Sequence, residues 1–281
     1  MTPAQPAAAA PGNALTHGRL GIIVGAGMLL AMVVAGTLVP WLSPFHPNDM
    51  ITRPLRPPSW IHPFGTDQLG RDVFTRTFAA VYRDLGVAFL GVTIPLMIGT
   101  VVGVLLSISK NRVLVTLISS IIEAINALPL LVIAIALIAL VGPGLGSIVL
   151  VLAMTNWARY ARIARSRAEI VSREGYIEAA RLQGYSHTRI FFRHFLPNVS
   201  SETVAYGLSD FILVIMLIAG LSFLSLGATP PTAEWGAMMS EGRPFVQQAW
   251  WMTIFPGVAL CWAGISASFI AEGLSRRERG V

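Results

Sequence analysis

The sequence predicts an all-α integral membrane protein. Apolar residues make up 54% of the 281 residues and charged residues only 12%, against roughly 25% charged in soluble domains. Charge-free runs extend over residues 20–48, 85–109, 211–233 and 244–271. Each run exceeds the roughly 20 residues that a helix needs to cross a bilayer. A soluble globular fold is therefore excluded.

Six transmembrane helices follow when these runs are taken in order. The run over residues 124–158 holds one more span and the start of another, separated by the breaking segment Gly142-Pro143-Gly144-Leu145-Gly146. We expect helices near residues 20–42, 85–108, 116–140, 145–165, 203–227 and 250–272. Three prolines inside them can kink the backbone and so suit a moving helix bundle: Pro95, Pro129 and Pro256.

We expect four successive parts along the chain. Residues 1–19 are rich in Ala and Pro without a hydrophobic core, so we expect a disordered N-terminus. The next apolar run is too long for a signal peptide's core, so the first helix should stay as an anchor. Residues 20–84 then hold this helix, an external loop and an interfacial helix, residues 85–275 form the main helical core, and residues 276–281 are a tail.

Basic residues predict the orientation. Fourteen of the twenty Lys and Arg residues lie on the side that carries the polar loop around residues 159–193, and cytoplasmic segments carry such an excess. Five of the other six lie in the external loop of about forty residues, whose length makes them weak orienting signals. Both termini should therefore face the cytoplasm. A pI near 10 also occurs in nucleic-acid-binding proteins, but here the charges sort by membrane side and we expect no nucleic-acid partner.

The polar loop itself is amphipathic. One face of a helix that runs from the membrane into the loop should carry isoleucines spaced by seven residues, opposite charged residues: Ile163, Ile170 and Ile177 against Arg167, Glu174 and Arg181. Gly184 can end this helix in the left-handed conformation. A second amphipathic segment should follow, with apolar Ile190, Phe191 and Phe195, and Pro197 should stop it.

Within this loop the string Glu178-Ala179-Ala180, then Gly184, then Leu196-Pro197 resembles the EAA loop of the membrane subunits of bacterial ABC importers. The resemblance implies a type I ABC importer transmembrane domain, with residues 85–275 as its core. It also implies two short helices that dock on a cytoplasmic ATPase through Glu178, Ala179, Ala180, Gly184, Leu196 and Pro197. Glu178 should meet a basic group of the ATPase, and the two alanines should permit close approach. The alternative is an ordinary solvated loop, since Glu-Ala-Ala alone is common in helices.

The chain lacks the groups that hydrolyse ATP. Lys110 is the only lysine, and its neighbours exclude a Gly-Lys-Ser/Thr phosphate loop. ATP and Mg should therefore bind separate subunits, and no cofactor or catalytic residue is expected here. The resemblance implies two ATPase subunits, a second homologous membrane subunit and an extracytoplasmic solute-binding protein, all in or at a bacterial inner membrane.

Enzyme and metal chemistry find little support. All five histidines lie outside the expected spans, which removes a Ser-His protease arrangement at depth. No compact ligand spacing joins the external candidates for a metal site, His46, His62, Asp49 and Asp67. Cys261 is the only cysteine, so no disulfide forms within the chain.

An ion-coupled secondary transporter is the alternative function. Such proteins use buried carboxylates, and this chain has Glu123, Asp210 and Glu272 near or inside spans. Glu123 can sit close to the cytoplasmic interface and Glu272 lies at the inner boundary. Asp210 has no partner evident from the sequence. An ion-coupled carrier has no need of the EAA loop, however.

The external loop and three later segments resemble one branch of the ABC importer family. Residues 62–76 of the loop, together with 220–227, 230–236 and 240–243, look like the C-type membrane subunit of the dipeptide, oligopeptide and nickel importers. Peptides are thus the expected substrate, with nickel complexes or glutathione as alternatives. Thr66 or Asp67 should cap a helix lying along the membrane surface, with an apolar stripe of Phe74, Phe78, Val81 and Leu85. The tail departs from the family's usual pattern at residues 271–276, which puts its contact with an ATPase in doubt.

Overall fold

The computed structural model describes residues 11–279, and every regular element in this part of the chain is a helix. The elements, in chain order, are α1 (Pro11–Leu42), α2 (Val73–Ala79), α3 (Val81–Ile108), α4 (Arg112–Ala127), α5 (Leu130–Val141), α6 (Leu145–Thr155), α7 (Trp157–Val171), α8 (Gly175–Leu182), α9 (His187–Ile190), the π-helical η1 (Phe191–Phe195), α10 (Leu196–Phe223), α11 (Trp235–Gly242), the 3-10 turn η2 (Arg243–Phe245) and α12 (Trp251–Arg279).

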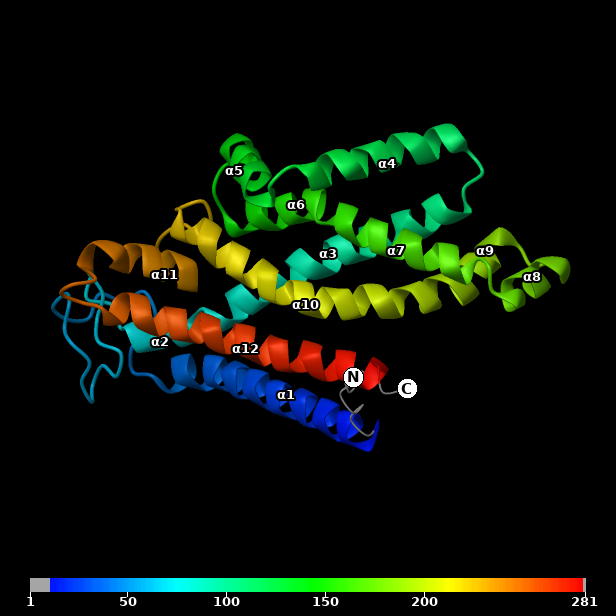
Figure 1. Cartoon of the computed structure of the whole chain (residues 1–281). Coiled ribbons are helices and arrows are strands. Elements are labelled where there is room, and N and C mark those ends of the chain that lie inside the picture. The colour runs from blue at the N-terminus through cyan, green and yellow to red at the C-terminus, as the bar shows by residue number, and fades with distance from the viewer. Residues whose placement is uncertain (1–10, 280–281) are drawn as a thin grey trace, which may run out of the picture.

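The long helices α1, α3, α10 and α12 run side by side along one axis (Figure 1). At one end, which we call the loop end, lie α8 and α9, and α1 begins and α12 ends toward this side. At the opposite end lie α2, α11 and the irregular segment 43–72. The EAA loop, residues 172–195, and the long irregular segment thus lie at opposite ends of the bundle.

Within residues 11–279, four segments are long and apolar enough to cross a bilayer: Gly18–Leu42, Val73–Ile108, Thr188–Phe223 and Trp251–Ser275. A fifth candidate is the pair α4 and α5, bent by 98°. The bend follows from Pro129, because the residue before a proline is driven out of the helical region, and Leu128 is extended with ψ of 142°. The all-α membrane fold is thereby confirmed.

Two of the six expected spans are interrupted. The helix expected at 116–140 is the bent pair α4 and α5, and the one expected at 145–165 is divided at Asn156 between apolar α6 and arginine-rich α7. The N-terminal expectation also needs correction, because α1 begins at Pro11 rather than near residue 20. The rest of the expected disordered segment, residues 1–10, and residues 280–281 of the tail lie outside the described residues.

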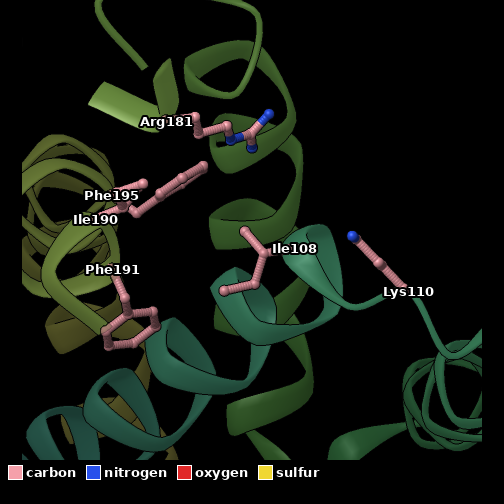
Figure 2. A pocket seen from close by; sticks show the side chains of 6 residues that line it. All are labelled: Ile108, Lys110, Arg181, Ile190, Phe191 and Phe195. Atoms are coloured by element: carbon pink, nitrogen blue, oxygen red, sulfur yellow. The ribbon is translucent and has the colours of Figure 1, made fainter. Parts of the chain in front are cut away.

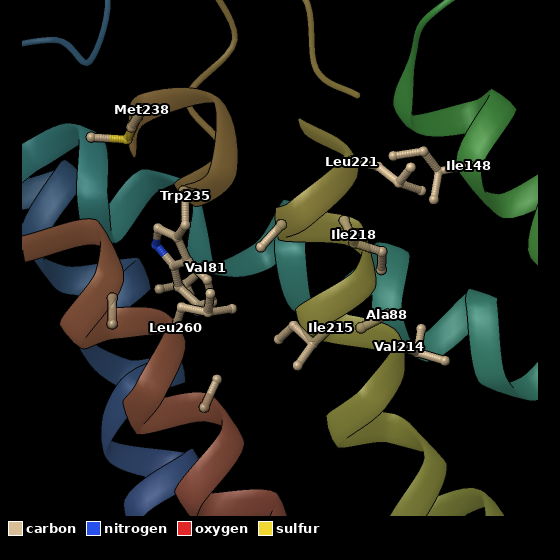
Figure 3. Close-up of a cluster of buried hydrophobic side chains, with 14 of the residues drawn as sticks. Val81, Ala88, Ile148, Val214, Ile215, Ile218, Leu221, Trp235, Met238 and Leu260 are labelled. Carbon is tan, nitrogen blue, oxygen red and sulfur yellow. The ribbon is translucent and has the colours of Figure 1, made fainter. Parts of the chain in front are cut away.

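The main core joins α3, α10, α11 and α12. Figure 3 shows Val81 and Leu260 beside Trp235, and Ala88 beside the α10 residues Val214 and Ile215. Trp235 is fully buried, and its Nε1 donates to the carbonyl of Thr77 at 2.9 Å. Many large apolar side chains on the outer faces of the helices remain exposed. An exposed apolar surface of this extent fits a protein surrounded by lipid or by other subunits.

Helix α7 packs on α3 through small residues. A Cβ on Gly103 would lie 2.3 Å from the carbonyl oxygen of Ala161 and 2.7 Å from the Cβ of Ala164, so only glycine fits there. Close approach through small residues is the usual basis of helix packing in membranes. The expected isoleucine face is therefore wrong for α7, since Ile170 is 52% exposed while Ala161, Ala164 and Ala168 are buried.

At the opposite end, buried ion pairs join segment 43–72 to α11. Arg71 donates from Nε to Asp67 and from Nη2 to Glu241 Oε2, the latter at 2.6 Å. Arg76 lies 3.8 Å from Asp67 and 3.9 Å from Glu241. Both arginine side chains are 1% exposed, and buried charges persist only when they are paired. Two strings far apart in the sequence, 62–76 and 235–243, thus form one structural unit.

This end also corrects two expectations. The N-cap of α2 is Asp72, whose carboxylate accepts from the backbone N–H of Thr75 at 2.8 Å, rather than Thr66 or Asp67. The other oxygen of Asp72 lies 2.9 Å from Nδ1 of His62. The helix then continues through Ala80 into α3, and Phe74 and Phe78 pack around Phe64 instead of lying on a membrane surface. Phe64 in turn stacks on Phe255 of α12, with ring centroids 3.8 Å apart.

Candidate functional site

The first half of the EAA loop is helix α8, which ends at Leu182 and is followed by the C-cap Gln183 and by Gly184. Gly184 has a φ of +76°, the left-handed conformation expected from the sequence. The N–H of Tyr185 donates to the carbonyl of Ala180 at 3.1 Å, and that of Gly184 donates to Arg181 at 3.0 Å. These two bonds make a Schellman motif, which satisfies the last carbonyls of a helix and reverses the chain. After this turn the chain returns, and Ile190 of α9 joins the same apolar cluster as Ile177 and Ala180.

The inner face of the loop has its own small core. Ile177 and Ala180 of α8 are 0% and 5% exposed, and they pack with Ile190, Phe191 and Phe195 from the second half of the loop. Ala180 was expected at the surface that meets an ATPase, but its side chain faces this core. Ala180 therefore contributes to the packing of the loop itself.

The outer face of α8 is free. The side chains of Glu178 and Ala179 are exposed, and Glu178 makes no hydrogen bond or ion pair within the described part of the chain. Leu182 is 84% exposed, four residues after Glu178 and hence on the same helix face. We did not anticipate Leu182 from the sequence. Its signal was an apolar residue on the face opposite Ile177, where a solvated helix would carry a polar one.

The second half of the loop is π-helical before it becomes α10. Residues 191–195 form η1, and Leu196 and Pro197 then begin α10, so Pro197 does not stop the segment as we expected. Proline is tolerated in the first turn of a helix because the N–H groups there have no partner within the helix. Leu196 is half-buried and Pro197 exposed. Both residues thus stand where the loop passes into α10.

The electrostatics of the loop are strongly basic. A shallow groove of about 520 Å³ on its outer side is lined by polar, aromatic and basic side chains: Ser186, Thr188, Arg189, Phe192 and Arg193. The guanidinium of Arg189 lies 4.0 Å from the ring centroid of Tyr185, a cation–π contact that holds it in place. Exposed apolar and basic groups therefore lie together, and such a surface suits a protein partner with acidic groups.

The loop is fastened to the bundle by polar contacts. The hydroxyl of Tyr160 on α7 donates to Asp210 Oδ2 on α10 at 2.9 Å, which supplies the partner that the sequence did not reveal. Thr100 on α3 donates to Thr203 on α10 at 3.1 Å. The first contact joins the helices that enter and leave the EAA loop, and the second joins the leaving helix to α3. Glu123, another candidate for ion coupling, is exposed on α4.

Two bacterial peptide permeases are similar to this chain in sequence. The dipeptide transport system permease of Alkalihalophilus pseudofirmus is 35% identical over 90% of this chain and 83% of its own length. The di/tripeptide transport system permease of Pseudomonas aeruginosa is 31% identical over 90% of this chain and 86% of its own length.

Two solved structures show the same fold. A chain of the MetNI methionine ABC transporter in inward-facing conformations has a TM-score of 0.57 at 17% identity, covering 73% of this chain and 96% of its own. A chain of an amino acid ABC transporter has a TM-score of 0.53 at 20% identity, covering 73% and 94%. Residues 99–280 match the family described as the inner membrane component of binding-protein-dependent transport systems. The chain belongs to this family of multi-pass, non-catalytic ABC importer permeases.

Proposed function

We propose that this chain is one of two homologous membrane subunits of an ATP-driven importer of di- or oligopeptides. The substrate class rests on relatives whose names specify dipeptide or di/tripeptide transport and which align with nearly the whole chain. An ATPase and a solute-binding protein are the partners of this permease family. Two ATPase subunits bind at the loop end and the solute-binding protein docks at the opposite end. We place the transport core at residues 85–275, a range that includes most of the residues 99–280 matched by the family.

The EAA loop is the element that contacts the ATPase. The observation that carries this role is the outer face of α8, where Glu178, Ala179 and the 84%-exposed Leu182 are presented on a rigid turn. Exposing the apolar Leu182 to water is unfavourable, and the carboxylate beside it has no partner. A groove of the ATPase with apolar and basic side chains would bind both groups. Ala180, Gly184, Leu196 and Pro197 act indirectly, since they shape the loop and its entry into the membrane.

The loop end faces the cytoplasm in this proposal. Fourteen of the twenty basic residues belong to segments at that end, as the positive-inside rule requires. The beginning of α1 and the end of α12 lie toward the same side, so both termini are cytoplasmic as well. This orientation leaves segment 43–72 and α11 outside.

The experiment compares assembly of variants in proteoliposomes. Glu178→Lys should release the ATPase subunits from the purified complex, because reversing a charge that is buried in an interface costs about 2–5 kcal/mol. Leu182→Ala should weaken the same contact less. The readouts are pull-down of the ATPase subunits and substrate-stimulated ATP hydrolysis.

The matched control is Glu169→Lys, which makes the same charge change on α7 and sacrifices only an exposed ion pair with Arg165. It should leave assembly intact. If Glu178→Lys and Leu182→Ala complexes assemble and transport as the unmodified complex does, the outer face of α8 is not the ATPase contact.

A further inference from the structure

Two neighbouring hollows meet at the loop end of α3. The first, of about 200 Å³, is lined by Ile108, Lys110, Arg181, Ile190, Phe191 and Phe195. Figure 2 shows Ile190, Phe191 and Phe195 on one wall, with Ile108 facing them and with Arg181 and Lys110 at the rim. The second hollow, of about 390 Å³, lies between α3 and α4 and also includes Ile108. Ile108 therefore forms the boundary between a hollow with cations and an apolar one.

The two cations at the first hollow have no partner in the described part of the chain. The side chains of Lys110 and Arg181 make no hydrogen bond or ion pair within residues 11–279, although ion pairs occur elsewhere at the loop end. Both side chains are exposed. They come from separate elements, the end of α3 and the end of α8, so the fold brings two unpaired positive charges to the edge of one cavity.

The second hollow is almost entirely apolar. Its lining consists of Val102, Leu105, Leu106, Ile108 and Ser109 from α3 and its end, and Leu114 and Ile118 from α4. Leu105 and Leu114 are 48% and 46% exposed, so this crevice opens on the outer surface. Ile108 is also the last residue of the apolar span Val73–Ile108. The cationic hollow thus lies at the boundary of the hydrocarbon layer and the apolar crevice lies within it.

We propose that this paired site binds an anionic glycerophospholipid. Its phosphate accepts hydrogen bonds from Lys110 and Arg181, and one acyl chain lies in the crevice between α3 and α4. Basic pockets at the cytoplasmic ends of membrane helices bind the headgroups of anionic lipids, and Arg and Lys are the side chains that bind phosphate. The apolar crevice distinguishes a lipid from free phosphate, because only a lipid fills both hollows at once.

The site would connect the lipid to the EAA loop. Arg181 belongs to the last turn of α8, whereas Lys110 follows the end of α3. A lipid held by both would therefore fix the loop against the membrane helix. Lipid binding at this site is independent of the transported substrate, since it involves only the permease and the surrounding bilayer.

The test measures lipids retained by the complete complex after extraction from nanodiscs containing phosphatidylglycerol and phosphatidylcholine, by native mass spectrometry. Phosphatidylglycerol should be retained in preference. Lys110→Gln and Arg181→Gln should each weaken its retention about fivefold, from about 1 kcal/mol per basic side chain, and the double variant more. Leu114→Trp should also reduce retention by filling the crevice.

Two matched controls separate this site from general surface effects. Arg173→Gln removes an exposed cation of the EAA loop outside both hollows, and Leu117→Trp enlarges an apolar residue of α4 that is 59% exposed and outside the crevice. Both should retain phosphatidylglycerol normally. Equal loss in these controls, or equal retention of the two lipids, would overturn the proposal.

Two further outcomes would assign the cations to another ligand. If millimolar inorganic phosphate displaces the bound lipid completely, the site recognises a free anion. If the double Gln variant loses the ATPase subunits while its lipid content is unchanged, Lys110 and Arg181 contact the ATPase instead. Either result would contradict lipid binding, and neither bears on whether the chain is an importer subunit.

Discussion

Tyr160 and Asp210 join the helix that enters the EAA loop to the helix that leaves it. The hydroxyl of Tyr160 donates to Asp210 Oδ2 at 2.9 Å, and the two residues are 0% and 2% exposed. Movement of the loop therefore cannot separate α7 from α10 at this depth without leaving a buried carboxyl group without its hydrogen bond. The pair is the simplest route by which displacement of the loop reaches both helices together.

Tyr160→Phe should destabilise the complex by about 1–3 kcal/mol, because the buried Asp210 loses its donor. The double change Tyr160→Phe with Asp210→Leu should cost less than the sum of the single changes, since removing both polar partners leaves nothing unsatisfied. Thermal unfolding in detergent measures this cycle. Tyr206→Phe, which removes the hydroxyl of a ring 5.2 Å from that of Tyr160, is the control. Strict additivity would show that the bond contributes no coupling.

Gly184→Ala should impair transport, because its φ of +76° costs an L-residue about 1–2 kcal/mol. Space is not the cause, since a Cβ on Gly184 would meet nothing within 4 Å. Gly175 is the matched control, since a Cβ there also meets nothing within 4 Å and its φ is not positive. Gly175→Ala should be tolerated. Uptake and hydrogen exchange of the loop are the measurements, and equal behaviour of the two variants would contradict a conformational role for Gly184.

Glu241→Ala should lower the free energy of unfolding by about 3–5 kcal/mol, because it leaves the buried guanidinium of Arg71 with only one carboxylate. Glu241→Gln should cost less, since the amide oxygen can still accept from Arg71. Thermal unfolding and protease sensitivity of segment 43–72 are suitable measurements. Wild-type stability in Glu241→Ala would mean that α11 and this segment are held together by apolar contacts alone.

Glu234 should make stability depend on pH. Its buried side chain accepts from the backbone N–H groups of Gly236 and Ala237, at 2.9 and 2.7 Å, but burial outweighs these bonds and raises its pKa above the usual value of 4.5. A raised pKa in the folded state means that stability is greatest below the unfolded pKa and falls as pH rises through the folded pKa. Melting temperature across this window should decline in the unmodified complex and more gently in Glu234→Gln. An identical slope in both would remove Glu234 as the cause.

The sequence by itself determined the membrane class, the place of the EAA loop and the turn at Gly184. Each of these depends on local properties: apolar run length, the spacing of a motif, and the one residue type that adopts positive φ cheaply. The family resemblance was confirmed by the family match over residues 99–280 and by dipeptide and di/tripeptide permeases that align with 90% of the chain.

Tertiary structure alone decided which faces are buried. Ile170 was expected on the apolar face of its helix but is exposed, because Gly103 lets the alanines of α7 approach α3 more closely than isoleucine could. Likewise Arg71 meets Glu241 across 170 residues, and Tyr160 meets Asp210 across 50. The pattern of one helix shows that a polar group needs a partner, but the choice of partner follows from how distant segments pack, which local spacing does not encode.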